Sequence, residues 1–165
     1  MIGNDIVDLA LAKIQSNWRR KGFLDKIFTE SEKKIILKSK NQEVEVWKLW
    51  SRKEAVYKIF NRLTQQNIFN PLQIECYHSS KICKEKYGII ICKEKTYYTR
   101  TIINADYIYS EAVCNTDDFS KIKFILRPKN IIKKNGVPSY IDKIDFIIKP
   151  ISITHHGRFE RIISI

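Results

Sequence analysis

The sequence has no long apolar run, and none of its stretches approaches the roughly 18 to 20 uninterrupted apolar residues that cross a bilayer. Its start, MIGNDIVDL, lacks the basic flank and the apolar segment of a secretory signal. These two absences predict a cytoplasmic protein. A content of 44% hydrophobic and 12% aromatic residues excludes intrinsic disorder. At 165 residues, we expect one domain that spans 1–165.

Cysteine is also scarce, and no two cysteines stand in a CxxC pair that could grip a metal ion. The four are Cys76, Cys83, Cys92 and Cys114. In a reducing compartment such cysteines usually act as small buried hydrophobic residues, so we expect that role for them.

Acidic residues are outnumbered, since 30 Lys and Arg face 18 Asp and Glu and leave a formal charge of +12. This excess favours a polyanionic partner, which includes nucleic acid, a phosphorylated cofactor, an acidic protein and an anionic membrane surface. Charge alone does not choose among these partners. Specific motifs are needed to identify the partner.

The first part of the chain reads as a strand followed by helices. Residues 1–9 form a short apolar strand that carries Asp5 and Asp8. Thr29 and Glu32 form a T-x-x-E capping box, which predicts a helix that begins at Thr29. The longest helix is expected over Asn41–Asn61, where apolar residues recur at three- and four-residue steps. Those residues are Val46, Leu49, Trp50, Tyr57 and Phe60.

After Asn70-Pro71 the apolar period changes from 3.6 to 2, which predicts strands. The expected strands are LQIECYH, YGIIICKE, TYYTRTII and YIYSEAVC, then KFIL up to Pro128 and apolar runs over 141–154 and 159–165. Asn135 to Pro138 is expected to form a turn. Helices followed by strands predict an α+β fold, with an antiparallel sheet packed against a long central helix.

The segment WSRKEAVYK holds the most informative polar residues. Glu54 and Lys58 are four residues apart and share one helix face, Trp50 extends that face, and Lys53 is adjacent. One interpretation is a solvated ion pair that contributes about 0.3 to 0.5 kcal/mol. The apolar stripe nearby and a second acid in an apolar strand, Asp5, favour another interpretation, in which two carboxylates share a divalent cation.

In each of two further pairs of polar residues, one residue is a candidate for the functional site. A three-residue step places Asp5 and Asp8 on opposite faces of a strand. We choose Asp5, because Gly3 permits a close approach of backbone or ligand, although Asp5 could instead be a turn residue. His155 and His156 point in opposite directions on a strand, so at most one belongs to a site, and a structural or solvated role is the alternative.

Five short segments, in this order, resemble motifs of the 4'-phosphopantetheinyl transferase superfamily, and more closely its holo-acyl-carrier-protein synthase branch. They are GNDIV at 3–7, IFTESE at 27–32, WSRKEAVYK at 50–58, NGVP at 135–138 and SITH at 152–155. Three positions depart from the family pattern. No glycine follows shortly after the motif at 50–58, Leu49 stands where an Arg is frequent, and Val7 stands where the larger branch has a second metal acid.

The resemblance implies transfer of 4'-phosphopantetheine from coenzyme A to a serine of an apo carrier protein, with release of 3',5'-ADP. By position, Asp5 and Glu54 would bind Mg²⁺, with Glu54 and Lys58 as catalytic residues. Lys58 would contact the phosphates of coenzyme A, Lys53 would contribute to phosphate binding, and His155 would reach the nucleotide end. Glu54 could alternatively act as the base for the serine hydroxyl, or hold a water that does. The net charge would steer coenzyme A and an acidic carrier.

Each chain has one copy of each motif, in the order of the small branch, where sites are completed between subunits. The resemblance therefore implies a homo-oligomer, such as a trimer, with interfacial sites. The extra hairpins before SITH resemble late strands of the larger branch, which suggests a chain intermediate between the two. Two alternatives stay open. One is a basic nucleic-acid-binding α+β domain that stacks bases on Lys93–Arg100, and the other is a degenerate relative that binds carrier protein without catalysis.

Overall fold

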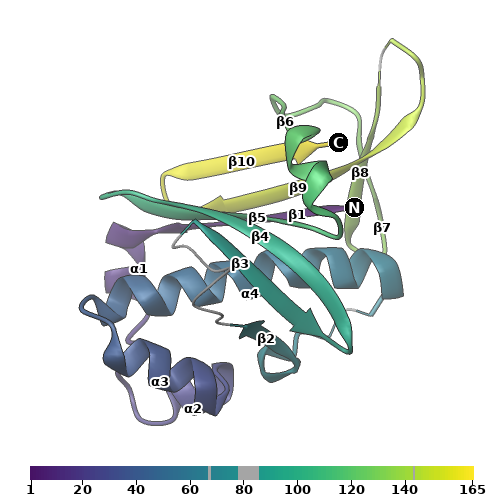
Figure 1. Ribbon diagram of the computed structural model, residues 1–165. Coiled ribbons are helices and arrows are strands. Elements are labelled where there is room, and N and C mark those ends of the chain that lie inside the picture. Colours follow the sequence, from purple (N-terminus) through teal and green to yellow (C-terminus); the bar gives the residue numbers. More distant parts are fainter. Residues whose placement is uncertain (67, 78–85, 143) are drawn as a thin grey trace.

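The computed structural model describes residues 1–66, 68–77, 86–142 and 144–165. Its first part is one strand followed by four helices (Figure 1). These elements are β1 (Ile2–Asp8), α1 (Leu9–Gln15), α2 (Phe23–Ile27), α3 (Glu30–Lys38) and α4 (Gln42–Thr64). Two short 3₁₀ turns follow, with η1 (Pro71–Gln73) between α4 and the next strand and η2 (Thr116–Ser120) between two later strands.

The first sheet has the order β1-β5-β4-β3-β2, and every neighbouring pair is antiparallel. Its later strands are β2 (Ile74–Tyr77), β3 (Tyr87–Cys92), β4 (Lys95–Ile103) and β5 (Tyr107–Val113). Helix α4 packs across this sheet and contacts all five strands, and α3 packs on α4 from outside (Figure 1). The first strand of the chain thus lies at one edge of the sheet.

The second sheet has the order β6-β10-β9-β8-β7, again with antiparallel neighbours. Its strands are β6 (Lys123–Phe124), β7 (Ile131–Lys134), β8 (Val137–Ile141), β9 (Ile148–His156) and β10 (Phe159–Ser164). Strands β9 and β10 both contact β1, on the opposite side of β1 from α4 (Figure 1). β1 is therefore held between the long helix and the C-terminal sheet.

The α+β fold with antiparallel strands and a long helix is confirmed. The predicted capping box is present, because Thr29 Oγ1 accepts from Glu32 N while the Glu32 carboxylate accepts from Thr29 N. The predicted turn is present too, with Asn135 and Gly136 at positive φ between β7 and β8. Instead of one sheet, the strands form two.

Three predictions about local structure need correction. The KFIL strand is shorter than expected, since β6 ends at Phe124. The run over 141–154 is not continuous, because β8 ends at Ile141 and β9 begins at Ile148. Cys76 and Cys92 are buried as expected, but Cys114 is exposed, and Cys83 lies outside the described residues.

The main core lies between α4 and the first sheet. Apolar side chains of the predicted α4 stripe are central to it, with Val46, Leu49 and Phe60 buried and Trp50 and Tyr57 packed at its margin. Burial of a large apolar side chain contributes roughly 1.5 to 3 kcal/mol, so this stripe fixes the helix against the sheet. Within the described part of the chain, no helix is long and apolar enough to cross a membrane.

Candidate functional site

Gly3 determines how closely β1 approaches α4. A Cβ atom at this position would lie 2.0 Å from the carbonyl oxygen of Ala55, so only a glycine fits there. The prediction that Gly3 permits a close backbone approach is confirmed, and the partner is the helix backbone. As a result, Asp5 on β1 comes beside the helix turn that carries Glu54 and Lys58.

Asp5 and Glu54 line the same cavity of about 280 Å³. This cavity, called here the acid cavity, also has Trp50, His155 and His156 in its wall. The two acids thus meet in an open cleft between β1, α4 and the end of β9, as the motifs predicted.

Two polar side chains, Thr154 and Lys58, approach the same oxygen of the Asp5 carboxylate. Thr154 Oγ1 lies 3.3 Å from Asp5 Oδ1, and Lys58 Nζ lies 3.8 Å from the same oxygen. Asp5 Oδ2 is buried and has no hydrogen-bond partner among the described residues. Burial raises the pKa of Asp5, although the charge of Lys58 opposes that shift.

Glu54 is half-buried on α4, and burial raises its pKa to about 7. The nearby charge of Asp5 raises the pKa further, whereas Lys58 lowers it. The two acids are therefore close enough to repel each other when both are ionised. A carboxyl with a pKa near neutrality is suited to exchange a proton at physiological pH.

Lys58 connects β1 to β9. Its Nζ donates to Asn4 O at 2.6 Å and to Ile153 O at 3.1 Å, and it faces Asp5. Burial lowers the pKa of this ammonium group. The interpretation of Glu54 and Lys58 as a solvated helix pair is wrong, because Lys58 turns to the backbone of two strands.

A second and larger cavity, of about 560 Å³, adjoins the first. Lys58 and His155 lie in its wall, together with Arg62, Arg127, Lys133 and Pro138. His155 borders both cavities. The larger one, called here the cationic cavity, therefore presents positive charge next to the two acids, as a multiply charged anion requires.

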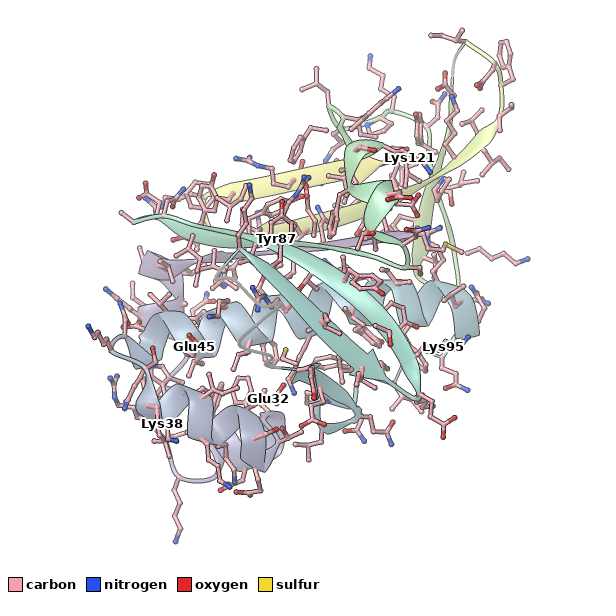
Figure 2. The ribbon with its side chains drawn as sticks, in the orientation of Figure 1. Glu32, Lys38, Glu45, Tyr87, Lys95 and Lys121 are labelled. Carbon is pink, nitrogen blue, oxygen red and sulfur yellow. The ribbon has the colours of Figure 1, made fainter. Side chains whose placement is uncertain are left out.

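The structure does not bring Lys53 to this site. Its side chain is fully buried, its Nζ lies 2.7 Å from Glu32 Oε2, and it also donates to Ile27 O and Pro71 O. Figure 2 labels Glu32 on α3, on the side of that helix that faces the rest of the molecule. The prediction that Lys53 contributes to phosphate binding is corrected, since the side chain has neither a free surface nor a spare donor.

Asp8 also lies apart from the two acids. It caps α1 by accepting from Ala10 N, and Arg158 binds both of its carboxylate oxygens. This pairing holds the pKa of Asp8 well below its usual range. A Cβ at Gly157 would lie 2.5 Å from Asp8 Oδ2, so the turn after β9 also needs a glycine.

The base-stacking platform predicted at Lys93–Arg100 does not present its tyrosines at the surface. Tyr97 is 1% exposed and belongs to the main core, and Tyr98 packs against a second, smaller core. Aromatic side chains must be exposed to stack on bases. This finding opposes the nucleic-acid alternative.

The residues present fit a divalent cation. One carboxylate oxygen is buried without a partner, and the two acids repel each other, so a cation between them would relieve both costs. No cluster of three or more His, Cys, Asp or Glu side chains suited to a metal exists in the described parts of the chain. Asp5 and Glu54 would therefore hold the ion with help from water and from phosphate oxygens, as Mg²⁺ sites commonly do.

Sequence reasoning missed two groups of residues. Arg62, Arg127 and Lys133 joined no motif, and only the long-range fold brings them together. Thr154 and His156 belonged to a visible pattern, because Ser152, Thr154 and His156 alternate on one face of β9. The signal was the two-residue polar spacing within an otherwise apolar run.

Four of the predicted site residues, Asp5, Glu54, Lys58 and His155, line the two cavities within one chain. The prediction of interfacial sites had assumed that a second subunit supplies one of them. Within this structure no second chain is needed to bring these four together. A homo-oligomer stays a prediction.

Comparisons with known proteins identify the family and the fold. Residues 1–112 match the family model of the 4'-phosphopantetheinyl transferase superfamily. The fold is similar to that of Helicobacter pylori holo-[acyl-carrier-protein] synthase in complex with coenzyme A (TM-score 0.52, 18% identity, 68% of this chain and 98% of that chain). No match was found among curated protein sequences.

Two further solved structures share the fold. One is a holo-(acyl-carrier-protein) synthase from Bacillus anthracis in complex with CoA (3',5'-ADP), with a TM-score of 0.51, 19% identity and coverage of 67% of this chain and 91% of that chain. The other is Thermotoga maritima holo-[acyl-carrier-protein] synthase (TM-score 0.53, 15% identity, 78% of each chain). With a family model that spans residues 1–112 and a fold shared with these synthases, the chain belongs to the 4'-phosphopantetheinyl transferase superfamily and is a transferase of the holo-acyl-carrier-protein synthase type.

Proposed function

We propose that this protein transfers 4'-phosphopantetheine from coenzyme A to a serine of an apo carrier protein, with Mg²⁺, and releases 3',5'-ADP. One observation carries the proposal. Two acids suited to a cation lie in a cavity that adjoins a cationic cavity, and Lys58 and His155 line that second cavity.

The role of each site residue follows from the cavity that it lines. Asp5 and Glu54 would hold Mg²⁺, which when bound neutralises negative charge on the pyrophosphate. Lys58 reaches the phosphates from the wall of the cationic cavity, and His155 binds the nucleotide end. Arg62 already donates to Pro138 O and Ile151 O, so it contributes positive charge to the cavity while its position is fixed.

The reaction is a displacement at the β-phosphorus of coenzyme A. The serine oxygen forms a bond to that phosphorus while the bond to the bridging oxygen of 3',5'-ADP breaks. The serine proton passes to a water that Glu54 holds, or to Glu54 itself in the alternative in which Glu54 acts as the base and not as a metal ligand. Charge grows on the phosphoryl and leaving oxygens, where Lys58 stabilises it.

A cationic surface beside the acid cavity suits an acidic carrier. Ser16 and Phe23 are in the wall of the acid cavity. The segment between them also lines a third cavity, of about 580 Å³. Its wall holds Arg19, Arg20, Lys21, Lys33 and Lys34, and Lys33 is paired with Asp25 and Glu30 of the same wall. An acidic carrier docked there would have its serine near the acids.

The direct test incubates the protein with coenzyme A, Mg²⁺ and an apo carrier protein, and measures the carrier by mass spectrometry. We expect the carrier to gain the mass of one phosphopantetheine, and this gain to disappear in EDTA. Glu54→Gln should abolish the product. Glu43→Gln is the matched control, because it removes a carboxylate from the first turn of the same helix.

The outcomes separate the alternatives. A folded protein that binds carrier but makes no product with any carrier tested would indicate the degenerate relative. Nucleic-acid affinity that Glu54→Gln leaves unchanged, without any transfer, would support the basic binding domain.

A further inference from the structure

The edge of β1 that faces away from β5 is closed by side chains of β9. In an antiparallel sheet an edge strand leaves alternate backbone N–H groups without a strand partner. Here three of them donate to β9 side chains. The pairs are Asn4 N to Ser152 Oγ at 3.0 Å, Ile6 N to Thr154 Oγ1 at 3.0 Å and Asp8 N to His156 Nδ1 at 2.8 Å.

Thr154 has a second contact that Ser152 does not show. Its Oγ1 lies 3.3 Å from Asp5 Oδ1, and Thr154 is 4% exposed. Because this oxygen already accepts from Ile6 N, its own hydrogen is available to donate to the carboxylate. Thr154 therefore links the backbone of β1 to the acid that β1 carries.

The contacts of Asp5 are unequal. Thr154 and Lys58 both approach Oδ1, whereas Oδ2 is buried without a partner among the described residues. A carboxylate that is tethered at one oxygen has a fixed plane, and its other oxygen has a fixed direction. A β-branched threonine adds stiffness, because its χ1 rotamers are restricted.

We propose that Thr154 is a positioning residue for the metal site. It orients Asp5 through Oδ1 so that Oδ2 is the oxygen offered to the cation. The inference rests on the proposed function, and it assigns to the S-I-T-H segment a role at the acid end of the site in addition to the contact of His155 with the nucleotide. Partners of this kind typically change metal affinity by about 10- to 100-fold when they are removed.

The experiment measures Mn²⁺ binding from the loss of the free-ion signal in electron paramagnetic resonance, with coenzyme A present and a blank titration of coenzyme A alone. Thr154→Val keeps the shape and removes the hydroxyl, and we expect it to weaken Mn²⁺ binding by about tenfold or more. Thr154→Ser keeps the hydroxyl, and its affinity should stay within about threefold of wild type. If Thr154→Val does not fold, Thr154→Ala carries the same test, because the smaller side chain leaves room for a water at Ile6 N.

Ser152→Ala is the matched control, because it also removes one side-chain acceptor from a β1 N–H but has no contact with Asp5. It should lower the thermal midpoint about as much as Thr154→Val and leave Mn²⁺ affinity unchanged. Wild-type affinity in the Thr154→Val protein would overturn the proposal, as would an equal loss of affinity in Ser152→Ala.

The same measurements distinguish a failure of the proposed function from a failure of the role proposed for Thr154. If wild-type protein binds no Mn²⁺, the metal-dependent reaction and the role of Thr154 are both wrong. If Mn²⁺ binding follows the expected order of variants but no carrier is modified, only the reaction is wrong.

Discussion

At the scale of single residues, Glu54 is a site residue whose charge lowers the stability of the folded protein at high pH. A free glutamate has a pKa of 4.5, and burial beside Asp5 raises this value to about 7 in the folded protein. The folded state therefore favours the protonated form. The stabilising contribution of that proton is complete below the unfolded pKa and is lost as the pH rises through about 7.

Glu54→Gln should therefore make the protein more stable at alkaline pH, even as it removes activity. Glutamine stays neutral, so without divalent cations we expect a gain of about 1 to 2 kcal/mol at pH near 8, after allowance for solvent at a half-buried group. That gain corresponds to a rise of roughly 2 to 8 °C in the thermal midpoint. Near pH 5 the two proteins should differ little. A difference of the same size at both pH values would show that the Glu54 charge is not its cause.

At the scale of elements, a buried ion pair joins the helices. Lys53 on α4 and Glu32 on α3 are both fully buried, and Glu32 Oε1 also accepts from Cys76 N of β2. The two most recognisable acids of the α3 and α4 motifs therefore have different roles. Glu32 connects elements, whereas Glu54 faces the cavity.

Lys53→Met should cost about 3 to 5 kcal/mol in urea unfolding, because it leaves a carboxylate buried without its cation. Lys33→Met is the matched control. Lys33 pairs with Asp25 and Glu30 at the surface, so its removal should cost much less than the removal of Lys53. Equal costs for the two variants would contradict the structural role of Lys53.

Gly3→Ala tests the contact between β1 and α4. The new methyl group would meet the backbone carbonyl of Ala55, so the strand and the helix must separate, and overpacking of this kind costs roughly 1 to 3 kcal/mol. Activity should fall much further than stability, because Asp5 moves away from Glu54. Gly22→Ala serves as control, since its Cβ would meet nothing within 4 Å and only its positive φ opposes the change. Transfer rates and urea midpoints of both variants check the expectation, which fails if Gly3→Ala remains as active as Gly22→Ala.

At the scale of the whole molecule, the four site residues lie in one chain. Glu54→Gln and His155→Ala should each be inactive, and a refolded mixture of the two should stay inactive, because no single chain in it has both residues. A site shared between subunits would instead regain activity in mixed assemblies. Transfer assays of the separate and mixed variants distinguish the two arrangements.

Much of this arrangement could be predicted from local sequence, because local rules decide it. The capping box at Thr29, the α4 stripe and the Asn135-Gly136 turn depend on residues a few positions apart. Lys53 was misplaced because spacing on a helix does not reveal which face a neighbouring helix covers. The cationic cavity was missed since Arg62 and Lys133 meet only after the second sheet has packed on β1. Long-range contacts of this kind leave no local pattern.

The closure of the β1 edge by β9 has a consequence for the biosynthesis of the chain. Strand β1 leaves the ribosome well before β9, because the side chains that accept from its N–H groups lie 148 residues later. Until β9 has been synthesised, this edge stays open to pairing with strands of other nascent chains. Expression with chaperones that shield exposed strands should therefore increase the yield of soluble protein.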